Sequence, residues 1–241
     1  MHHPLSIGAL VGHAICIDSA RAFKDESWIC DFPGEATYYF SHVLAFADAF
    51  RQGKFDFAVF SGGFTHAAAG VRSEAESYCD VARYWSYGTL DTNRVWHEEG
   101  AHDSFENFLF VLGLSRLRSG RWPSRVTFFG WSFKEERFEL HRQALRWPSD
   151  RYEYVGLNNP PAGEGLEKAL AGERAKCTAT RSDPYLRGAP WQLRRQQRNW
   201  RNLPNPYQAT VTELGPFFSY LNSSSPDDGQ FSNRFPWESC D

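Results

Sequence analysis

Two glutamates, Glu74 and Glu98, are of the residue type that general acid–base chemistry requires. Glu74 stands in the first turn of a predicted helix, and Glu98 lies near the end of a predicted extended segment. Aromatic residues make up 16% of the chain, so a cleft that holds both carboxylates is expected to have apolar walls. Two carboxylates in such a cleft are expected to differ in pKa, which separates the acid role from the base role. We therefore predict that Glu74 and Glu98 are catalytic.

The segment from Phe55 to Glu76 predicts how such residues are positioned. An apolar run over 57–60 reads as a strand, which breaks at Ser61-Gly62-Gly63, and a helix follows from Ser73. A strand that ends in glycines and leads into a helix is the geometry that brings backbone N–H groups toward a ligand.

The same spacing begins three predicted helices: Ser73-x-x-Glu76, Asp103-x-x-Glu106 and Ser132-x-x-Glu135. Such capping boxes stabilise a helix by about 0.5–2 kcal/mol and need no ligand to explain them. In a parallel sheet, however, helices that follow strands begin at the same edge, where their N-termini attract anionic groups. The predicted ligand-binding residues at this edge are Ser61, Gly62, Gly63, Arg72, Ser73, Asp103, Ser104, Asn107, Lys134 and Arg137. Their mixed charges suit a polar small molecule with both cationic and anionic parts better than a polyanion, and solvated side chains near helix ends are the alternative.

The apolar pattern predicts strands that alternate with helices. Predicted strands cover 5–17, 55–60, 92–99, 125–130 and 152–157, and predicted helices cover 36–50, 73–85, 108–117 and 132–145. This alternation indicates an α/β fold, a Rossmann-like three-layer α/β/α arrangement with a mostly parallel sheet. We assign residues 1–161 to this core domain.

After residue 161 the composition changes. A short helical piece over 166–171 is followed by a basic run over 192–201 and by a tail rich in Pro, Ser and Asn. We predict that residues 162–241 form an irregular C-terminal extension that wraps the core. The basic run could bind nucleic acid, form a solvated helix face, or close over the anion-attracting edge as a lid.

Composition excludes several classes of protein. A formal net charge of −3 and a pI near 6.2 give no general reason to expect nucleic acid or an anionic membrane as partner. Five widely spaced cysteines without a C-x-x-C pair favour neither a disulfide framework nor a zinc site, so we expect reduced thiols. The N-terminus lacks the features of a signal peptide, and 5–17 is too short to span a bilayer. We therefore predict a cytoplasmic protein.

Known catalytic motifs are absent from the sequence. There is no G-x-G-x-x-G, no G-x-x-x-x-G-K-[ST] and no G-x-S-x-G, so dinucleotide, P-loop and α/β-hydrolase sites lack their anchors. The histidines at 97 and 102 lie beside acidic residues and could ligate a metal, but their spacing is not H-E-x-x-H, and we predict no metal site. We interpret His13 as a hydrogen-bonded core histidine, with a catalytic role as the alternative.

Four blocks of the sequence resemble a known family. These are Phe60-Ser-Gly-Gly63, Arg72-Ser-Glu-Ala75, Glu98 followed by Asp103-Ser-Phe-Glu-Asn107, and Phe133-Lys-Glu-Glu-Arg137. Their order and spacing over about 8–161 are similar to the domain-of-unknown-function family typified by the bacterial proteins YdcF and SanA, especially its stand-alone fungal branch. The resemblance implies a Rossmann-like fold and S-adenosylmethionine as a possible ligand. It implies a polar pocket formed by Gly62, Gly63, Glu74, Glu98, Ser104, Glu106, Asn107 and Arg137.

Three functions follow as hypotheses. The first is a metal-independent acid–base enzyme of hydrolase, lyase or isomerase type that acts on a small anionic molecule, by analogy in specialised metabolism. The alternative is a non-catalytic protein that binds a nucleotide or S-adenosylmethionine. The third is an interaction protein that uses the C-terminal extension. The sequence does not fix the oligomeric state.

Overall fold

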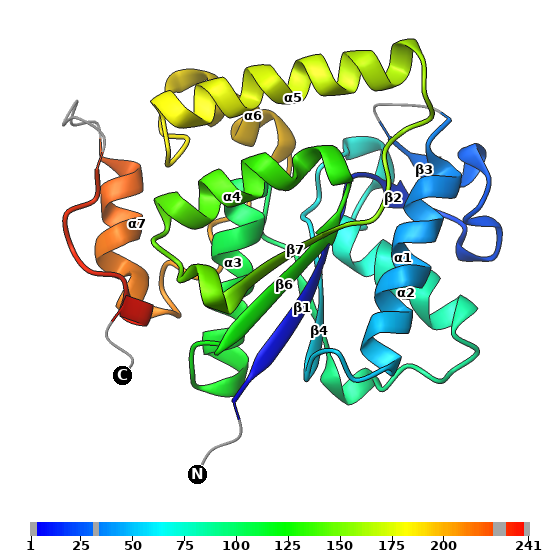
Figure 1. The fold of residues 1–241 in the computed structure, drawn as a ribbon, viewed down its shortest axis with the longest axis horizontal. Helices are drawn as coiled ribbons and strands as arrows, with labels where there is room; N and C mark the ends of the chain where they lie inside the picture. The colour runs from blue at the N-terminus through cyan, green and yellow to red at the C-terminus, as the bar shows by residue number, and fades with distance from the viewer. Residues whose placement is uncertain (1–3, 31–33, 224–229, 239–241) are drawn as a thin grey trace.

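A five-stranded parallel sheet forms the centre of the protein (Figure 1). The computed structural model describes residues 4–30, 34–223 and 230–238. The strands, in sheet order, are β5 (Val95–Glu98), β4 (Phe57–Ser61), β1 (Ser6–Val11), β6 (Arg125–Gly130) and β7 (Tyr152–Gly156). Leu10 in the central strand pairs with Phe60 on one side and Phe129 on the other. The predicted Rossmann-like α/β fold is confirmed.

Helices cover both faces of this sheet. The helices α1 (Ala36–Arg51) and α2 (Glu74–Trp85) lie on one face, and α3 (Ser104–Ser119) and α4 (Glu135–Ala144) lie on the other (Figure 1). Successive strand residues point to opposite faces, so in β1 Leu10 packs with α1 and α2 while Ala9 packs with α3. Both sides of the inner strands β4, β1 and β6 are therefore buried, which explains their largely apolar sequences.

The first predicted strand is wrong in extent. Residues 5–17 divide into β1 and a separate strand β2 (Ile15–Cys16), which pairs antiparallel with β3 (Trp28–Ile29). The chain leaves the main sheet at Gly12, whose N–H donates to the carbonyl oxygen of Ser61 at 2.8 Å. Apolar residues continue on both sides of this break, so the sequence pattern does not reveal it.

Two of the three predicted helix caps are confirmed. The side chains of Ser73 and Asp103 accept hydrogen bonds from the backbone N–H groups of Glu76 and Glu106, each at 2.9 Å. The third prediction is wrong, because Ser132 begins a 3-10 turn and α4 starts at Glu135 without a side-chain cap. The N–H of Ser132 instead donates to the Asn158 carbonyl at 2.8 Å, which ties this turn to the end of β7.

Short 3-10 helices connect several of these elements. Their bounds are Ser19–Arg21, Asp25–Ser27, Ala67–Ala69, Thr92–Arg94, Ser132–Lys134, Ser149–Arg151, Thr212–Leu214 and Pro236–Glu238.

The C-terminal extension is more helical than the sequence predicts. It contains α5 (Glu164–Ser182), α6 (Ala189–Arg198) and α7 (Gly215–Asn222), and α5 crosses above the carboxyl edge of the sheet (Figure 1). Gly165 and Gly172 flank the predicted piece 166–171, but α5 continues past both glycines through helix-favouring residues such as Ala175. Buried aromatic side chains such as Phe217 and Trp237 join the apolar cluster formed with α3 and α4. The Trp237 indole N–H donates to the Leu145 carbonyl at 2.9 Å. The extension therefore shares the core's apolar interior.

The described helices and cysteines can be compared with the prediction of a cytoplasmic protein that has reduced thiols. Within the described ranges, no helix combines the length and the apolar character needed to cross a bilayer. Cys16, Cys79 and Cys177 form no disulfide bonds. Cys240, which we also expect to be reduced, lies outside the described residues.

Candidate functional site

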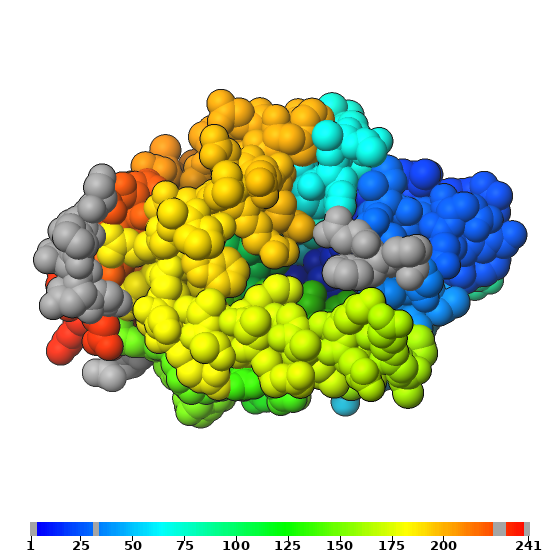
Figure 2. All heavy atoms as spheres, turned by 90° about the horizontal axis from the view of Figure 1, so that it is seen from above, coloured from blue at the N-terminus to red at the C-terminus, as the bar shows by residue number. Residues whose placement is uncertain are grey.

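A cavity of about 340 Å³ opens at the carboxyl edge of the sheet, between the ends of β1 and β6. The chain passes from β1 to one neighbour, β4, and later returns to the other side at β6, so this is the topological switch point of the fold. Figure 2 shows the cavity as a hollow between the surfaces of α5 and α6, with residues of the N-terminal segment at its floor. Ligands of open α/β sheets bind at such switch points.

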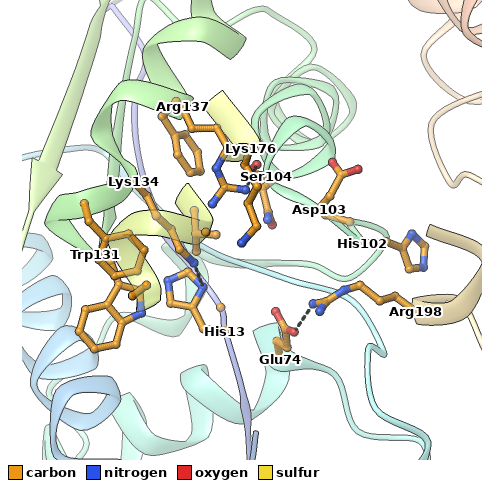
Figure 3. A pocket seen from close by; sticks show the side chains of 18 of the residues that line it. His13, Glu74, His102, Asp103, Ser104, Trp131, Lys134, Arg137, Lys176 and Arg198 are labelled. Carbon is orange, nitrogen blue, oxygen red and sulfur yellow. Dashed lines mark hydrogen bonds and ion pairs between the residues drawn. The ribbon is translucent and has the colours of Figure 1, made fainter. Parts of the chain in front are cut away.

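A histidine and a lysine meet at the floor of this cavity. His13 follows β1, Lys134 ends the turn after β6, and the Lys134 Nζ and His13 Nδ1 lie 3.1 Å apart (Figure 3). Burial and the charge of Lys134 lower the pKa of His13 well below its ordinary value. Burial and the charge of Arg137 likewise lower the pKa of Lys134. The pair therefore favours its neutral forms, in which either nitrogen can accept a proton.

The carboxylate of Glu74 also lines the cavity, and two glycines make room for it. A Cβ atom at Gly12 or Gly62 would stand 2.8 Å or less from Glu74 atoms. Gly62 also has a φ of +151°, which strains any other residue. The Glu74 side chain, in a residue only 2% exposed, accepts hydrogen bonds from Thr65 and from Arg198, the latter at 3.0 Å.

Arg137 connects the core to α5. Its Nε donates to the Glu173 carboxylate at 2.6 Å, and its guanidinium also donates to the Ser104 hydroxyl at 2.9 Å. Ser104 in turn lies 2.8 Å from the His141 ring nitrogen Nε2. Burial lowers the pKa of His141 to about 3, so this histidine is neutral near pH 7. The network fixes the direction of the Arg137 side chain at the cavity wall.

The basic segment of 192–201 lies over the carboxyl edge. Arg195 donates to Asp103 at 2.6 Å and lies 3.1 Å from Glu106, and Arg198 binds Glu74. Burial alone raises the pKa of Asp103, but the charge and hydrogen bond of Arg195 outweigh it, so this pKa is lowered. Arg201 stacks on the Phe64 ring. These contacts place one side of the segment over the edge, as the lid alternative expects, while most of its residues remain exposed to solvent.

The structure brings half of the predicted site residues to the cavity. Those that line it are Glu74, Asp103, Ser104, Asn107, Lys134 and Arg137. Those that lie elsewhere are Ser61, Gly62, Gly63, Arg72, Ser73 and Glu98. Gly63 packs against the backbone carbonyl of Ala101. Arg72 donates to the Cys16 carbonyl and to Asp80, and Ser73 donates to Glu99, so these side chains are used in structural contacts.

Glu98 is completely buried behind the cavity wall. Its carboxylate accepts hydrogen bonds from Ser61 Oγ at 2.8 Å, from the Gly100 N–H at 2.8 Å and from the Tyr207 hydroxyl at 3.3 Å. Burial raises the pKa of Glu98 to about 7. The Ser61 hydroxyl also lies 2.7 Å from Asn107 Oδ1, so Glu98 positions a residue of the cavity rather than facing it.

Several cavity residues escaped the sequence prediction. His13, Lys176, Arg198 and the indole rings of Trp131 and Trp191 all line the cavity. His13 follows a glycine at the end of an apolar run, which is the one sequence signal that could have placed it at the edge of the sheet. Lys176 and Trp191 belong to parts of the extension that the core pattern does not connect to the site, and Arg198 was connected to it only through the lid alternative for 192–201.

Of the two histidines that lie beside acidic residues, His97 belongs to β5 and His102 precedes α3. Within the described part of the chain, no group of three His, Cys, Asp or Glu side chains is arranged to hold a metal ion. His102 instead lies 3.0 Å from the Glu106 carboxylate.

The strand order defines a Rossmann-like α/β protein, and the cavity lies at its topological switch point. No protein-family model matches the chain. The uncharacterized protein YOR238W of Saccharomyces cerevisiae is 24% identical to it, over 45% of this chain and 49% of the yeast protein. The chain thus spans about half the length of this curated relative, and the similarity is distant.

Proposed function

We propose that the protein is an enzyme that binds a small anionic molecule in the switch-point cavity and acts on it by proton transfer. The observation that carries this proposal is that Glu74 faces the same cavity as the His13–Lys134 pair (Figure 3). A carboxylate and a neutral nitrogen base in one enclosed cavity are the components of acid–base catalysis. Glu98 does not line the cavity, so we assign it a positioning role instead of a catalytic one.

The charge of the cavity supports an anionic substrate. Arg137, Lys176 and Arg198 bring positive charge to it, and the starts of α2 and α3 add the positive ends of two helix dipoles. In the proposed reaction, these groups hold the anionic end of the substrate while His13 or Glu74 moves a proton.

A non-catalytic binder of a nucleotide or S-adenosylmethionine is the second candidate. The position at a Rossmann-like switch point and the rings of Tyr39, Trp131 and Phe133 in the cavity wall favour a flat base. The excess of cationic side chains suits nucleotide phosphates better than a sulfonium group. This candidate predicts binding without turnover.

We further propose that the chain belongs to the YdcF and SanA family and acts in the cytoplasm, in small-molecule metabolism. The order of the four sequence blocks and the Rossmann-like fold support the family assignment. Cys16, Cys79 and Cys177, which form no disulfide bonds, agree with a reducing compartment.

A thermal-shift screen followed by turnover assays tests the proposal. The purified protein is heated with nucleotides, S-adenosyl compounds, carboxylates and phosphates. A ligand at a hundredfold excess over its Kd stabilises the folded state by about 2.7 kcal/mol, which such a screen detects. Compounds that bind are then incubated with the enzyme, and products are followed by mass spectrometry.

The Glu74→Gln variant separates catalysis from binding. We expect turnover to fall by about 10²–10⁴-fold while the ligand still stabilises the protein. Glu76→Gln, on the same helix but outside the cavity, is the matched control and should keep full turnover. Binding without any turnover in the wild-type protein would favour the second candidate, and a screen in which nothing binds would contradict both.

A further inference from the structure

Two lysines from distant parts of the chain share the cavity without a counter-ion. Lys134 lies after β6 in the core, and Lys176 lies on α5 in the extension (Figure 3). Neither has a carboxylate within ion-pair distance among the residues that the structure describes. The titratable groups that interact with Lys134 are His13, Glu35, His42, Glu74, Arg137, Glu173 and Lys176. Those that act on Lys176 are Arg137, Glu173, Arg194 and Arg198.

The carboxylates near these lysines already have other ion-pair or hydrogen-bond partners. Glu173 is paired with a guanidinium at 2.6 Å, and Glu74 is paired with another at 3.0 Å. Glu35 accepts a hydrogen bond from the Tyr39 hydroxyl at 2.6 Å, and burial raises its pKa, which weakens it as a counter-ion. Two ammonium groups in one cavity therefore remain uncompensated, and such charges are costly unless something neutralises them.

The free protein lowers this cost by releasing protons. Burial and the nearby charge of Arg137 lower the pKa of Lys176 to about 8, and they lower the pKa of Lys134 as well. A bound anion would reverse the effect, because an opposite charge within a few ångströms favours the charged form of an amine. Binding of the right ligand is therefore coupled to proton uptake.

The shape of the cavity adds a second requirement for the ligand, in addition to its charge. Inorganic phosphate alone would leave most of a volume of about 340 Å³ empty. The rings of Tyr39, Trp131 and Phe133 line another part of the wall, and Trp131 stacks against both His13 and Phe133. Such a wall suits a flat apolar group attached to the anion.

We propose that the cavity binds a phosphomonoester with a flat, apolar body, whose dianionic phosphate lies between Lys134 and Lys176. This inference rests on the proposed function and names the substrate class of the same site. Two separate ammonium groups match the charge of about −2 and the three acceptor oxygens of a phosphomonoester better than a single carboxylate. The phosphate thereby joins a residue of the core to a residue of the extension.

Titration calorimetry on the full chain tests this inference with three probes: phenyl phosphate, inorganic phosphate and benzoate. Near pH 8, phenyl phosphate should bind at least about tenfold more tightly than the other two, because it alone supplies both the dianion and the ring. Titrations in two buffers of different ionisation enthalpy should show net proton uptake on binding. Lys134→Met and Lys176→Met should each weaken phenyl phosphate binding by about tenfold or more, the loss expected for one charge-assisted hydrogen bond.

Control variants show whether a loss of phenyl phosphate binding is specific to the charges of Lys134 and Lys176. Lys54→Met changes an exposed lysine in the turn between α1 and β4, at the opposite edge of the sheet, and should leave the Kd unchanged. Lys176→Arg keeps the charge and should retain binding. If either Met variant does not fold, as judged by circular dichroism, the corresponding Gln variant replaces it.

Each other outcome overturns the inference in a recognisable way. Phenyl phosphate binding that survives both lysine substitutions places the phosphate elsewhere. Benzoate binding as tight as that of phenyl phosphate means that a monoanion suffices, which leaves the proposed enzyme function intact. If none of the three probes binds, the phosphomonoester class is wrong. The proposed function fails as well only if no compound in the wider thermal-shift screen binds.

Discussion

Replacement of Lys176 by methionine should stabilise the free protein near pH 7. Methionine keeps most of the length and the apolar contacts of the side chain but removes a charge that has no described carboxylate partner. The pKa of Lys176 is lowered from 10.5 to about 8, which corresponds to a cost of about 3 kcal/mol for the charged form at about 1.36 kcal/mol per unit. The side chain is partly exposed to the solvent of the cavity, so we expect about 1–2 kcal/mol after screening.

The sign of the pH dependence follows from the same pKa. The folded state binds the proton of Lys176 more weakly than the unfolded state does, so the cost is fully present below about pH 8. It fades as the pH rises from about 8 to 10.5 and is absent above that value. The stabilisation of Lys176→Met should therefore be largest near pH 7 and should vanish at strongly alkaline pH.

Thermal unfolding of ligand-free protein at several pH values measures this effect. For a chain of 241 residues, a gain of about 1–2 kcal/mol raises the Tm by about 2–8 °C. Lys54→Met, at an exposed position, should change the Tm by less than about 2 °C and without this pH dependence. A Lys176→Met variant that is less stable than the wild type at pH 7, or whose gain is equal at all pH values, would refute the reasoning.

Two further predictions concern buried charges outside the lysine pair. The wild type should lose up to about 3 kcal/mol of stability as the pH rises from 4.5 to about 7, because the folded protein holds the Glu98 proton more strongly than the unfolded chain does. Glu98→Gln should reduce this loss. Urea unfolding of both proteins at pH 5 and pH 8 measures the difference. Arg195→Met should cost about 3–5 kcal/mol in urea unfolding, because it leaves the Asp103 carboxylate buried without its cation. Arg201→Met removes the stacking contact with the Phe64 ring and should cost less than about 1 kcal/mol. Equal losses of stability for Arg195→Met and Arg201→Met would contradict this account.

The sheet and its helices could be predicted because their signals are local. The apolar run of β4, the caps at Ser73 and Asp103 and the glycine after α3 each lie within a few residues of the structure they specify. The break after β1 was missed because apolar residues continue beyond Gly12, and only the spatial position of the Glu74 side chain shows why a glycine is needed there.

The cavity was harder to predict because distant residues build it. Arg198 reaches Glu74 across 124 positions, and Arg195 reaches Asp103 across 92. No spacing rule connects such positions, and the basic segment reads equally well as a solvated helix. Glu98 shows the opposite error, since its place near the end of a strand suggested catalysis, whereas the fold turns its carboxylate into the interior.

The division of the cavity between core and extension has a consequence for synthesis of the protein. The sheet and its four flanking helices are complete once residue 156 has been made, yet α5 and α6 extend to Arg198. In a nascent chain that ends at the last strand, Asp103 and Glu74 still lack their arginine partners. We therefore expect ligand affinity to be acquired late in translation, once α6 has been made, and a chain truncated before α6 should not bind the ligand.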